Sequence, residues 1–232
     1  MLTFIDSKPI TPSSSVWEEA YRRFETPDEE ISKFVKRLRE AGADKWNRTA
    51  RIGELFCGRG NGMHALARLG FRDVEGIDLS PTLASLYEGP GQVTVGDCRS
   101  LPWADGSKDV LIVQGGLHHL PDIERDLPLV LAEVRRVLVD GGRFIAIEPW
   151  LTPFLQLAHA ASFSVLRRVL DRVDAFATMV EHERETYERW LTSPELVRSL
   201  LEQYFRAEQL VLERGKMRFV GVRRDTSESP TR

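Results

Sequence analysis

Three glycines and one carboxylate have the spacing of a nucleotide-binding crevice. Gly58, Gly60 and Gly62 lie between an apolar run and a segment that reads as a helix, and Asp78 closes the next apolar run. A glycine lets the backbone approach a ligand closely, because no side chain intervenes. A carboxylate after the second strand can accept hydrogen bonds from two ribose hydroxyls. The order of strand, glycine loop, helix, strand and carboxylate therefore predicts a site for a nucleoside-containing ligand.

The glycine spacing and three further segments indicate which nucleoside cofactor would bind. The glycines depart from the G-x-G-x-x-G pattern of a dinucleotide site, because the third comes one position early. Asp97 follows a third expected strand, where its carboxylate could accept from an adenine amino group. His118 and His119 follow a fourth strand. A hairpin near the end of the chain is a feature that an ordinary dehydrogenase domain lacks.

The expected elements alternate along the chain. Apolar runs predict five strands, over residues 50–55, 73–78, 92–95, 109–114 and 144–147, and a hairpin of two more, over 209–212 and 217–222. Helices are expected over 28–41 and 127–138, and two more are expected to start at Ser80-Pro81 and at Ser193-Pro194. Gly141-Gly142 would end the helix over 127–138. Strands with so little alternation are typical of a parallel sheet covered on both faces.

In these motifs the sequence resembles the class I S-adenosylmethionine-dependent methyltransferases, in the methyltransferase type 11 branch that includes the ubiquinone and menaquinone biosynthesis enzymes. The resemblance is good over residues 50–148, and the remainder matches mainly by its pattern of elements. It implies an α/β fold with a Rossmann-like seven-stranded sheet in the order 3-2-1-4-5-7-6, strand 7 being antiparallel, and helices on both faces. It also implies S-adenosylmethionine as the cofactor.

The resemblance implies roles for individual residues. Glu54 stands where the family has an acidic residue near the methionine amino group, and Asp78 looks like the ribose ligand, with Leu79 against the adenine. Asp97 and the backbone of Cys98 match the adenine-contacting pair. The remaining expected cofactor positions are Phe56, Gly58, Gly60, Arg99 and Gln114.

Phe56 departs from the family, which usually has glycine there. A similar Leu-Phe-Cys-Gly run occurs in RNA 5-methyluridine methyltransferases, so phenylalanine can be tolerated. Those enzymes use an additional nucleophilic cysteine, whereas Cys57 and Cys98 both occupy cofactor positions here. That chemistry is therefore not expected.

Three residues are candidates for catalysis. A sulfonium methyl is a strong electrophile, so the enzyme must mainly place a nucleophile in line with it. A base is needed only if the nucleophile arrives protonated. His118 and His119 lie at the carboxyl edge of the sheet, where ligands bind, and Glu148 leaves the fifth strand at the same edge. The alternatives are that the histidines only shape their loop and that Glu148 caps the following helix.

The domain organisation follows from these elements. We expect an N-terminal arm and helix over 1–45, a cofactor-binding domain over 46–222 with a helical lid insertion over 150–190, and a disordered tail over 223–232. The stretch 151–166 carries no charge, and we favour core and pocket wall for side chains such as Phe154 and Leu155. A helix that dips into a membrane surface or meets a partner chain stays open.

Composition limits the function further. The 232 residues carry a formal net charge of −3, which gives no reason to expect nucleic-acid binding. Two cysteines suggest no disulfide framework, which is compatible with the cytoplasm. No metal cluster or secretory signal is visible, and the uncharged stretch is shorter than the roughly 20 residues of a spanning helix. A monomer or a homodimer fits equally.

The sequence therefore predicts a metal-independent S-adenosylmethionine-dependent methyltransferase that acts by direct displacement on a small or lipid-like molecule. Three alternatives stay open. The first is a non-catalytic accessory or sensor protein that binds the same cofactor. The second is an NAD-dependent oxidoreductase, which the glycine spacing disfavours. The third is an RNA methyltransferase, which the acidic balance disfavours.

Overall fold

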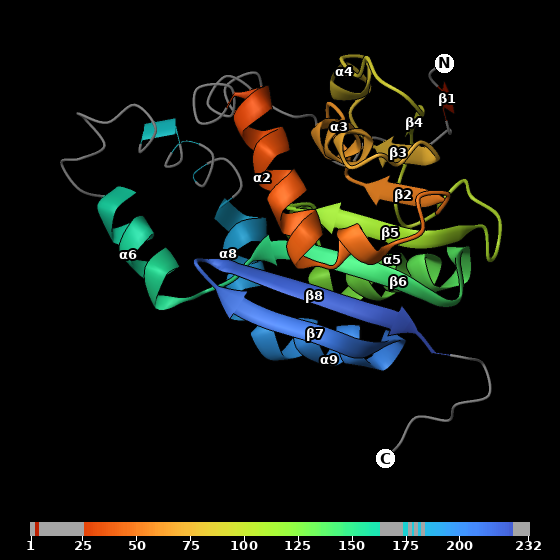
Figure 1. Ribbon diagram of the computed structural model, residues 1–232. Helices are drawn as coiled ribbons and strands as arrows, with labels where there is room; N and C mark the ends of the chain where they lie inside the picture. The colour runs from red at the N-terminus through yellow and green to blue at the C-terminus, as the bar shows by residue number, and fades with distance from the viewer. Residues whose placement is uncertain are drawn as a thin grey trace.

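The computed structural model describes residues 3–4, 26–162 and 184–224, together with 174, 175, 178 and 181. A single sheet of eight strands forms the centre, with helices on both of its faces (Figure 1). No helix in these described ranges is long and apolar enough to cross a membrane.

The sheet has the predicted topology. Its strands are β1 (Thr3–Phe4), β2 (Ile52–Leu55), β3 (Val74–Asp78), β4 (Gln92–Val95), β5 (Lys108–Gln114), β6 (Leu138–Pro149), β7 (Phe205–Glu213) and β8 (Lys216–Arg223). They lie in the order β1-β4-β3-β2-β5-β6-β8-β7. Neighbours are parallel except that β8 is antiparallel to both β6 and β7. From β2 onward this is the order 3-2-1-4-5-7-6 with an antiparallel seventh strand, so the predicted sheet is confirmed.

The first strand lies in the N-terminal arm, where the sequence predicts no strand. Thr3 and Phe4 pair in parallel with Thr94 and Val95 at the edge of β4. A strand of two residues is too short to carry a periodic pattern, so the sequence gives no signal for it. The rest of the expected arm, up to residue 25, lies outside the described residues.

Side-chain caps decide where several helices begin. The helices are α2 (Pro27–Glu40), α3 (Asn61–Arg68), α4 (Pro81–Ala84), α5 (Ile123–Val137), α6 (Pro153–Ser162), α8 (Arg184–Thr192) and α9 (Pro194–Tyr204), with short 3-10 turns η1 (Ala43–Lys45) and η2 (Leu117–His119). Thr26, Ser80 and Asp122 each accept a hydrogen bond from the backbone amide three residues on. Such caps satisfy amides that the first turn leaves unbonded.

Two expected boundaries near α5 are wrong. The cap at Asp122 starts the helix four residues before the predicted start at 127. The pair Gly141-Gly142 does not end the helix, which already stops at Val137, but lies within β6. The fifth strand is therefore longer than the predicted run over 144–147, because backbone pairing extends beyond the apolar core of the strand.

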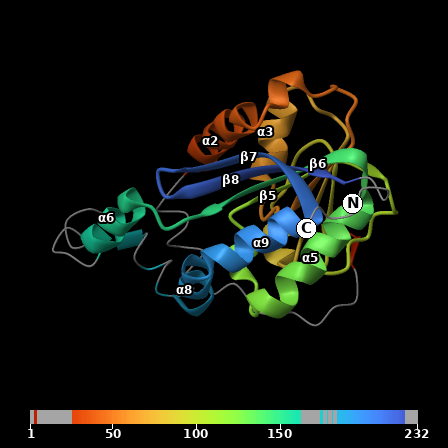
Figure 2. The ribbon, with the colours of Figure 1, turned by 90° about the horizontal axis from the view of Figure 1, so that it is seen from below.

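The core has two layers, one on each face of the sheet. Figure 2 shows α2 and α3 on one side of the strands and α5 and α9 on the other. Val110 and Ile112 pack toward α2 and α3, whereas Leu111 and Val113 pack toward α5 and α9. All four side chains are buried. Both faces of β5 are therefore covered, as the lack of alternation in its sequence indicates.

The insertion begins against the terminal hairpin. The Thr152 hydroxyl accepts from the amides of Leu155 (3.3 Å) and Gly215 (2.9 Å), which fixes the first turn of α6 on the turn between β7 and β8. Leu155 is buried there, but Phe154 and Leu157 are 59% and 70% exposed. The expectation of core for this stretch is correct for Leu155 and wrong for Phe154, because only one side of α6 meets the hairpin.

Other predictions for this part of the chain lie outside the described residues. They concern the stretch 151–166 after residue 162, most of residues 163–183 in the expected lid, and the tail from residue 225; Arg223, expected in the tail, is instead the last residue of β8.

Candidate active site

The glycine loop joins β2 to α3 at the carboxyl edge of the sheet. Gly60 caps α3 with φ of 80°, a conformation that L side chains rarely adopt. The ring of Tyr87 also occupies the space where a side chain on Gly60 would begin. Glycine is therefore required here both by the backbone and by the neighbouring ring, and the loop passes close beneath Tyr87.

Asp78 ties the glycine loop to the end of β3. One carboxylate oxygen accepts from the Gly58 amide at 2.7 Å, and the other accepts from the Ser80 amide at 2.8 Å. Burial raises the pKa of Asp78, and these two amides oppose the rise. Each oxygen keeps a further lone pair. Asp78, with Leu79 beside it, is thus placed in the loop where the sequence predicts ribose and adenine contacts.

Glu54 is a buried carboxylate beneath the same loop. It is 3% exposed, and it lies so close to Gly62 that a side chain there would collide with it. Burial, followed by the charge of Glu30, raises the pKa of Glu54 to about 8, although Gln114 and the Met63 amide oppose the rise. The Glu54 carboxyl group is therefore expected to lose its proton when a cationic group binds beside it.

Glu54 and Gln114 lie on adjacent strands, β2 and β5. Glu54 Oε2 and both amide atoms of Gln114 are buried and make no hydrogen bond of good geometry among the described residues, although Gln114 lies close enough to Glu54 to lower its pKa. Buried polar atoms are nearly always bonded in folded proteins. The Glu54 carboxylate could pair with an ammonium group of a ligand, and the Gln114 amide could donate to a ligand carboxylate. The head group of methionine carries both of these groups.

Glu30 fastens α2 to the glycine loop. This carboxylate is 8% exposed and accepts from Asn61 Nδ2 at 2.5 Å and from Arg59 Nη2 at 3.2 Å. The sequence reasoning missed Glu30. A signal was present, because Glu30 and Phe34 are four residues apart and therefore share the apolar face of α2.

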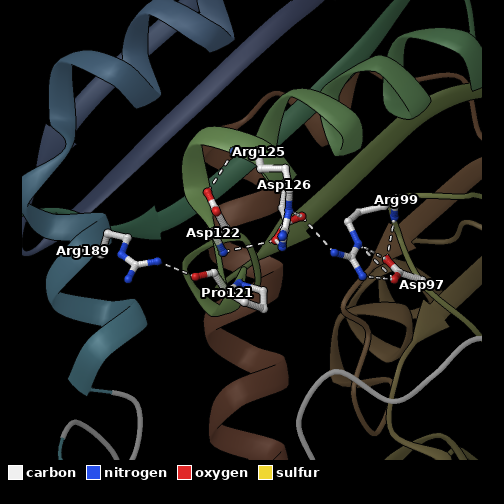
Figure 3. A network of polar contacts seen from close by, with 7 residues as sticks. All are labelled: Asp97, Arg99, Pro121, Asp122, Arg125, Asp126 and Arg189. Carbon is white, nitrogen blue, oxygen red and sulfur yellow. Dashed lines mark hydrogen bonds and ion pairs between the residues drawn. The ribbon is translucent and has the colours of Figure 1, made fainter.

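Asp97 lies in a network with two arginines and a second aspartate (Figure 3). The Arg99 guanidinium donates to Asp97 through Nη2 at 2.6 Å and to Asp126 through Nη1 at 2.9 Å. Asp126 is fully buried and also accepts from Arg125. The adenine contact of Asp97 stays a prediction, and Arg99 holds its carboxylate in place.

Figure 3 also shows how this network meets α8. The Asp122 amide donates to Asp126 at 3.2 Å, and Arg189 of α8 donates to the carbonyl of Pro121. The start of α5 is therefore bonded both to the loop after β4 and to α8. Cys98, in that loop, is buried, and burial raises the pKa of its thiol, so the thiol stays protonated.

His118 and Glu148 are hydrogen-bonded to each other. His118 Nδ1 lies 2.8 Å from Glu148 Oε2, and Glu148 Oε1 accepts from the amides of Gly116 and Leu117, both at 2.9 Å. Burial favours a higher pKa for Glu148, but the bond and charge of His118 and the two amides prevail and lower it. The alternative that Glu148 caps the next helix is wrong, since Thr152 provides that cap.

Aromatic rings surround this pair. The rings of His118 and His119 are 4.1 Å apart, and Tyr187 of α8 meets His118 edge-on at 5.8 Å. The Phe56 ring lies against Gly116. Trp190 Nε1 donates to the carbonyl of Pro149 at 2.8 Å and holds α8 at the end of β6. The structure thus brings together the three catalytic candidates and adds Tyr187.

In the described part of the chain, no group of three or more histidine, cysteine, aspartate or glutamate side chains could hold a metal ion.

Comparisons with known proteins agree with this geometry. Residues 54–146 match the family described as methyltransferase domain. The chain is 36% identical over 98 residues to the ubiquinone/menaquinone biosynthesis C-methyltransferase UbiE of Caulobacter vibrioides, covering 39% of this chain and 37% of that protein. It is 29% identical to the dimethylglycine N-methyltransferase of Parasynechococcus marenigrum, covering 65% of this chain and 54% of that protein. The chain therefore spans only about a third to a half of these relatives.

A solved structure supports the fold. The PH0226 protein of Pyrococcus horikoshii OT3 superimposes with a TM-score of 0.68 at 19% identity, and the match covers 91% of this chain and 100% of that one.

The sheet order, the glycine loop and the matched residues define a class I S-adenosylmethionine-dependent methyltransferase domain. S-adenosylmethionine is the cofactor of this class. Within the class, the matched segment is similar to UbiE-type enzymes.

Proposed function

We propose that the protein transfers the methyl group of S-adenosylmethionine to a small, lipid-like acceptor. The observation that carries the proposal is that Glu54 Oε2 and the side-chain amide of Gln114 are buried and make no hydrogen bond of good geometry among the described residues. A structural pair would be expected to satisfy its own hydrogen bonds, because an unsatisfied buried polar group costs about 1–3 kcal/mol. A bound methionine head group would remove that cost.

The remaining cofactor contacts follow from the loops at the same edge. Asp78 and Leu79 would hold the ribose and one face of the adenine. Asp97, fixed by Arg99, would accept from the adenine amino group, with the Cys98 amide beside it. When bound, the cofactor supplies an electrophilic methyl on a sulfonium. The chain has to orient the acceptor toward that methyl and keep water out.

The relatives suggest the acceptor. One is named for C-methylation in ubiquinone and menaquinone biosynthesis, and another for N-methylation of dimethylglycine. We favour a quinone-like acceptor, because aromatic and apolar side chains such as Phe56 and Tyr187 surround the catalytic candidates, and Leu155 is buried at the start of the lid. A small charged amine would find fewer polar partners there.

Calorimetry tests the proposal. S-adenosylmethionine is titrated into the wild type, into Asp78→Ala and into Asp73→Ala, a matched control at the opposite end of the same strand. We expect binding to the wild type and the control, and at least tenfold weaker binding to Asp78→Ala. A wild type that binds no S-adenosylmethionine would refute the proposed function.

A further inference from the structure

We propose that His118 and Glu148 act together as a base that takes a proton from the acceptor, so that the acceptor is a hydroxylated compound, a phenol or an enol. This inference rests on the proposed function and names the chemical class of its substrate. His118 would be the catalytic residue, and Glu148 a positioning residue that acts through it.

The hydrogen bonds of Glu148 fix the orientation of the imidazole. Its two oxygens have separate partners, His118 Nδ1 for one and the amides of Gly116 and Leu117 for the other. Since both amides belong to the segment that carries His118, the ring and the carboxylate are held as one unit. When the imidazole is neutral, the carboxylate accepts the Nδ1 proton, so Nε2 carries the lone pair.

The pair lies next to the cofactor side of the crevice. Gln114, one of the two residues with open polar atoms, is followed by Gly115, and a side chain on Gly115 would begin 3.9 Å from His118 Cε1. Cε1 lies between the two ring nitrogens. The imidazole therefore lies next to the backbone that follows Gln114. The His118 base and a cofactor bound at Gln114 would thus be neighbours in the crevice.

Burial makes a purely structural role costly. Glu148 is fully buried and His118 is 8% exposed. Taking a carboxylate out of water costs several kcal/mol unless its partners repay it. Among the described residues, titratable groups that face His118 are Glu148 from β6, His119 from η2 and Tyr187 from α8. A buried carboxylate behind the imidazole stabilises the imidazolium that forms when Nε2 takes a proton.

The proposed step balances. The acceptor O–H proton moves to His118 Nε2 while the electron pair of the oxygen, or of a conjugated ring carbon, forms the bond to the methyl carbon. The carbon–sulfur bond breaks, and its electron pair stays on sulfur as a neutral thioether. In methylation at carbon, the ring proton then moves to the oxygen. One proton remains on His118 and passes to solvent after each transfer.

A tertiary amine would not need this apparatus. It reacts as the free amine, whose nitrogen already carries the reacting electron pair. Its proton passes to solvent before the transfer, so the transfer step itself releases none. A buried base that is held by three hydrogen bonds would then be idle. The His118–Glu148 pair therefore favours a hydroxylated acceptor over a tertiary amine.

The test measures transfer of labelled methyl from S-adenosylmethionine to 1,4-naphthohydroquinone, to catechol and to N,N-dimethylglycine, without oxygen, in single turnovers across pH. We expect transfer to a hydroxylated probe with one proton released per methyl. His118→Gly should lower the rate by about 10²–10⁴-fold, the usual range for a general base. Added imidazole should restore the rate in proportion to its neutral fraction.

Glu148→Gln separates positioning from packing. The glutamine oxygen can still accept from Gly116 and Leu117, but its NH₂ group donates to His118 Nδ1 and moves the imidazole proton to Nε2. We expect a rate loss of at least tenfold with S-adenosylmethionine affinity unchanged by calorimetry. Glu195→Gln, on the exposed first turn of α9, is the control that should keep the wild-type rate.

The outcomes distinguish this inference from the proposed function. Cofactor binding without transfer to either hydroxylated probe overturns the inference, as does transfer to dimethylglycine alone. A His118→Gly protein that keeps the wild-type rate, or loses it without rescue by imidazole and with an unchanged pH profile, also overturns it. Failure to bind S-adenosylmethionine at all counts against the proposed function instead.

Discussion

Glu30 of α2 lies close enough to Glu54 of β2 to act on its ionisation: burial, and after it the charge of Glu30, raises the pKa of Glu54 to about 8. The two carboxylates come from different layers of the fold, and both lie beside the glycine loop, since Glu30 bonds Asn61 and Glu54 touches Gly62. The affinity for a cationic head group should therefore depend on pH.

We expect S-adenosylmethionine binding to tighten as pH rises. Below about pH 8 Glu54 is protonated in the free protein and has to release a proton before it can pair with an ammonium group. Above that pH the proton is already lost, and the affinity should level off. Calorimetry at pH 7 in two buffers of different ionisation enthalpy should show proton release, and Glu54→Gln should show none. Proton uptake on binding would contradict this account.

The double variant Gly60→Ala/Tyr87→Ala tests the packing of the glycine loop. Gly60→Ala should lower the free energy of unfolding by more than the roughly 1–2 kcal/mol of left-handed strain, because it also collides with Tyr87. Gly58→Ala is the matched control, since Gly58 has positive φ but open space around it. Adding Tyr87→Ala should recover part of the loss at Gly60. Equal effects at the two glycines in urea unfolding would argue against the contact.

Asp126→Asn should destabilise the protein by about 3 kcal/mol at neutral pH, as expected when a buried ion pair loses one charge. Burial favours a higher pKa for Asp126, but the hydrogen bonds from Arg125 and Arg99 prevail and lower it. A lowered folded pKa means stability that is present above the unfolded pKa of about 3.9 and is lost as pH falls further. The difference between variant and wild type should therefore shrink in unfolding measurements near pH 3. A difference that is constant with pH would exclude a charge effect.

Substitutions in α6 should separate buried from exposed positions of one helix. Leu155→Ala should cost about 2–4 kcal/mol, because Leu155 is buried against the hairpin turn. Phe154→Ser and Leu157→Ser, at strongly exposed positions, should change stability by less than about 0.5 kcal/mol. A large loss for Leu157→Ser in thermal unfolding would show that its side chain is covered in solution.

The strands and helices could be predicted from the sequence because the patterns that mark them are local. The apolar runs around Ile52–Leu55 and Lys108–Gln114 mark strands, and Ser80-Pro81 marks a helix start, since each depends on a few neighbouring residues. The strand order came from the resemblance to a family rather than from these patterns. Boundaries such as the start of β6 failed, because backbone pairing between strands decides them.

What the sequence by itself determined is the glycine loop, the acids that follow the strands and the alternation of strands and helices. Only the tertiary structure decided which side chains meet: Glu148 with His118, 30 residues apart, Glu30 with Asn61, and Arg99 with both Asp97 and Asp126. The reason is physical. Periodicity records which face of an element is buried, whereas a hydrogen bond between distant residues depends on how the elements pack against one another.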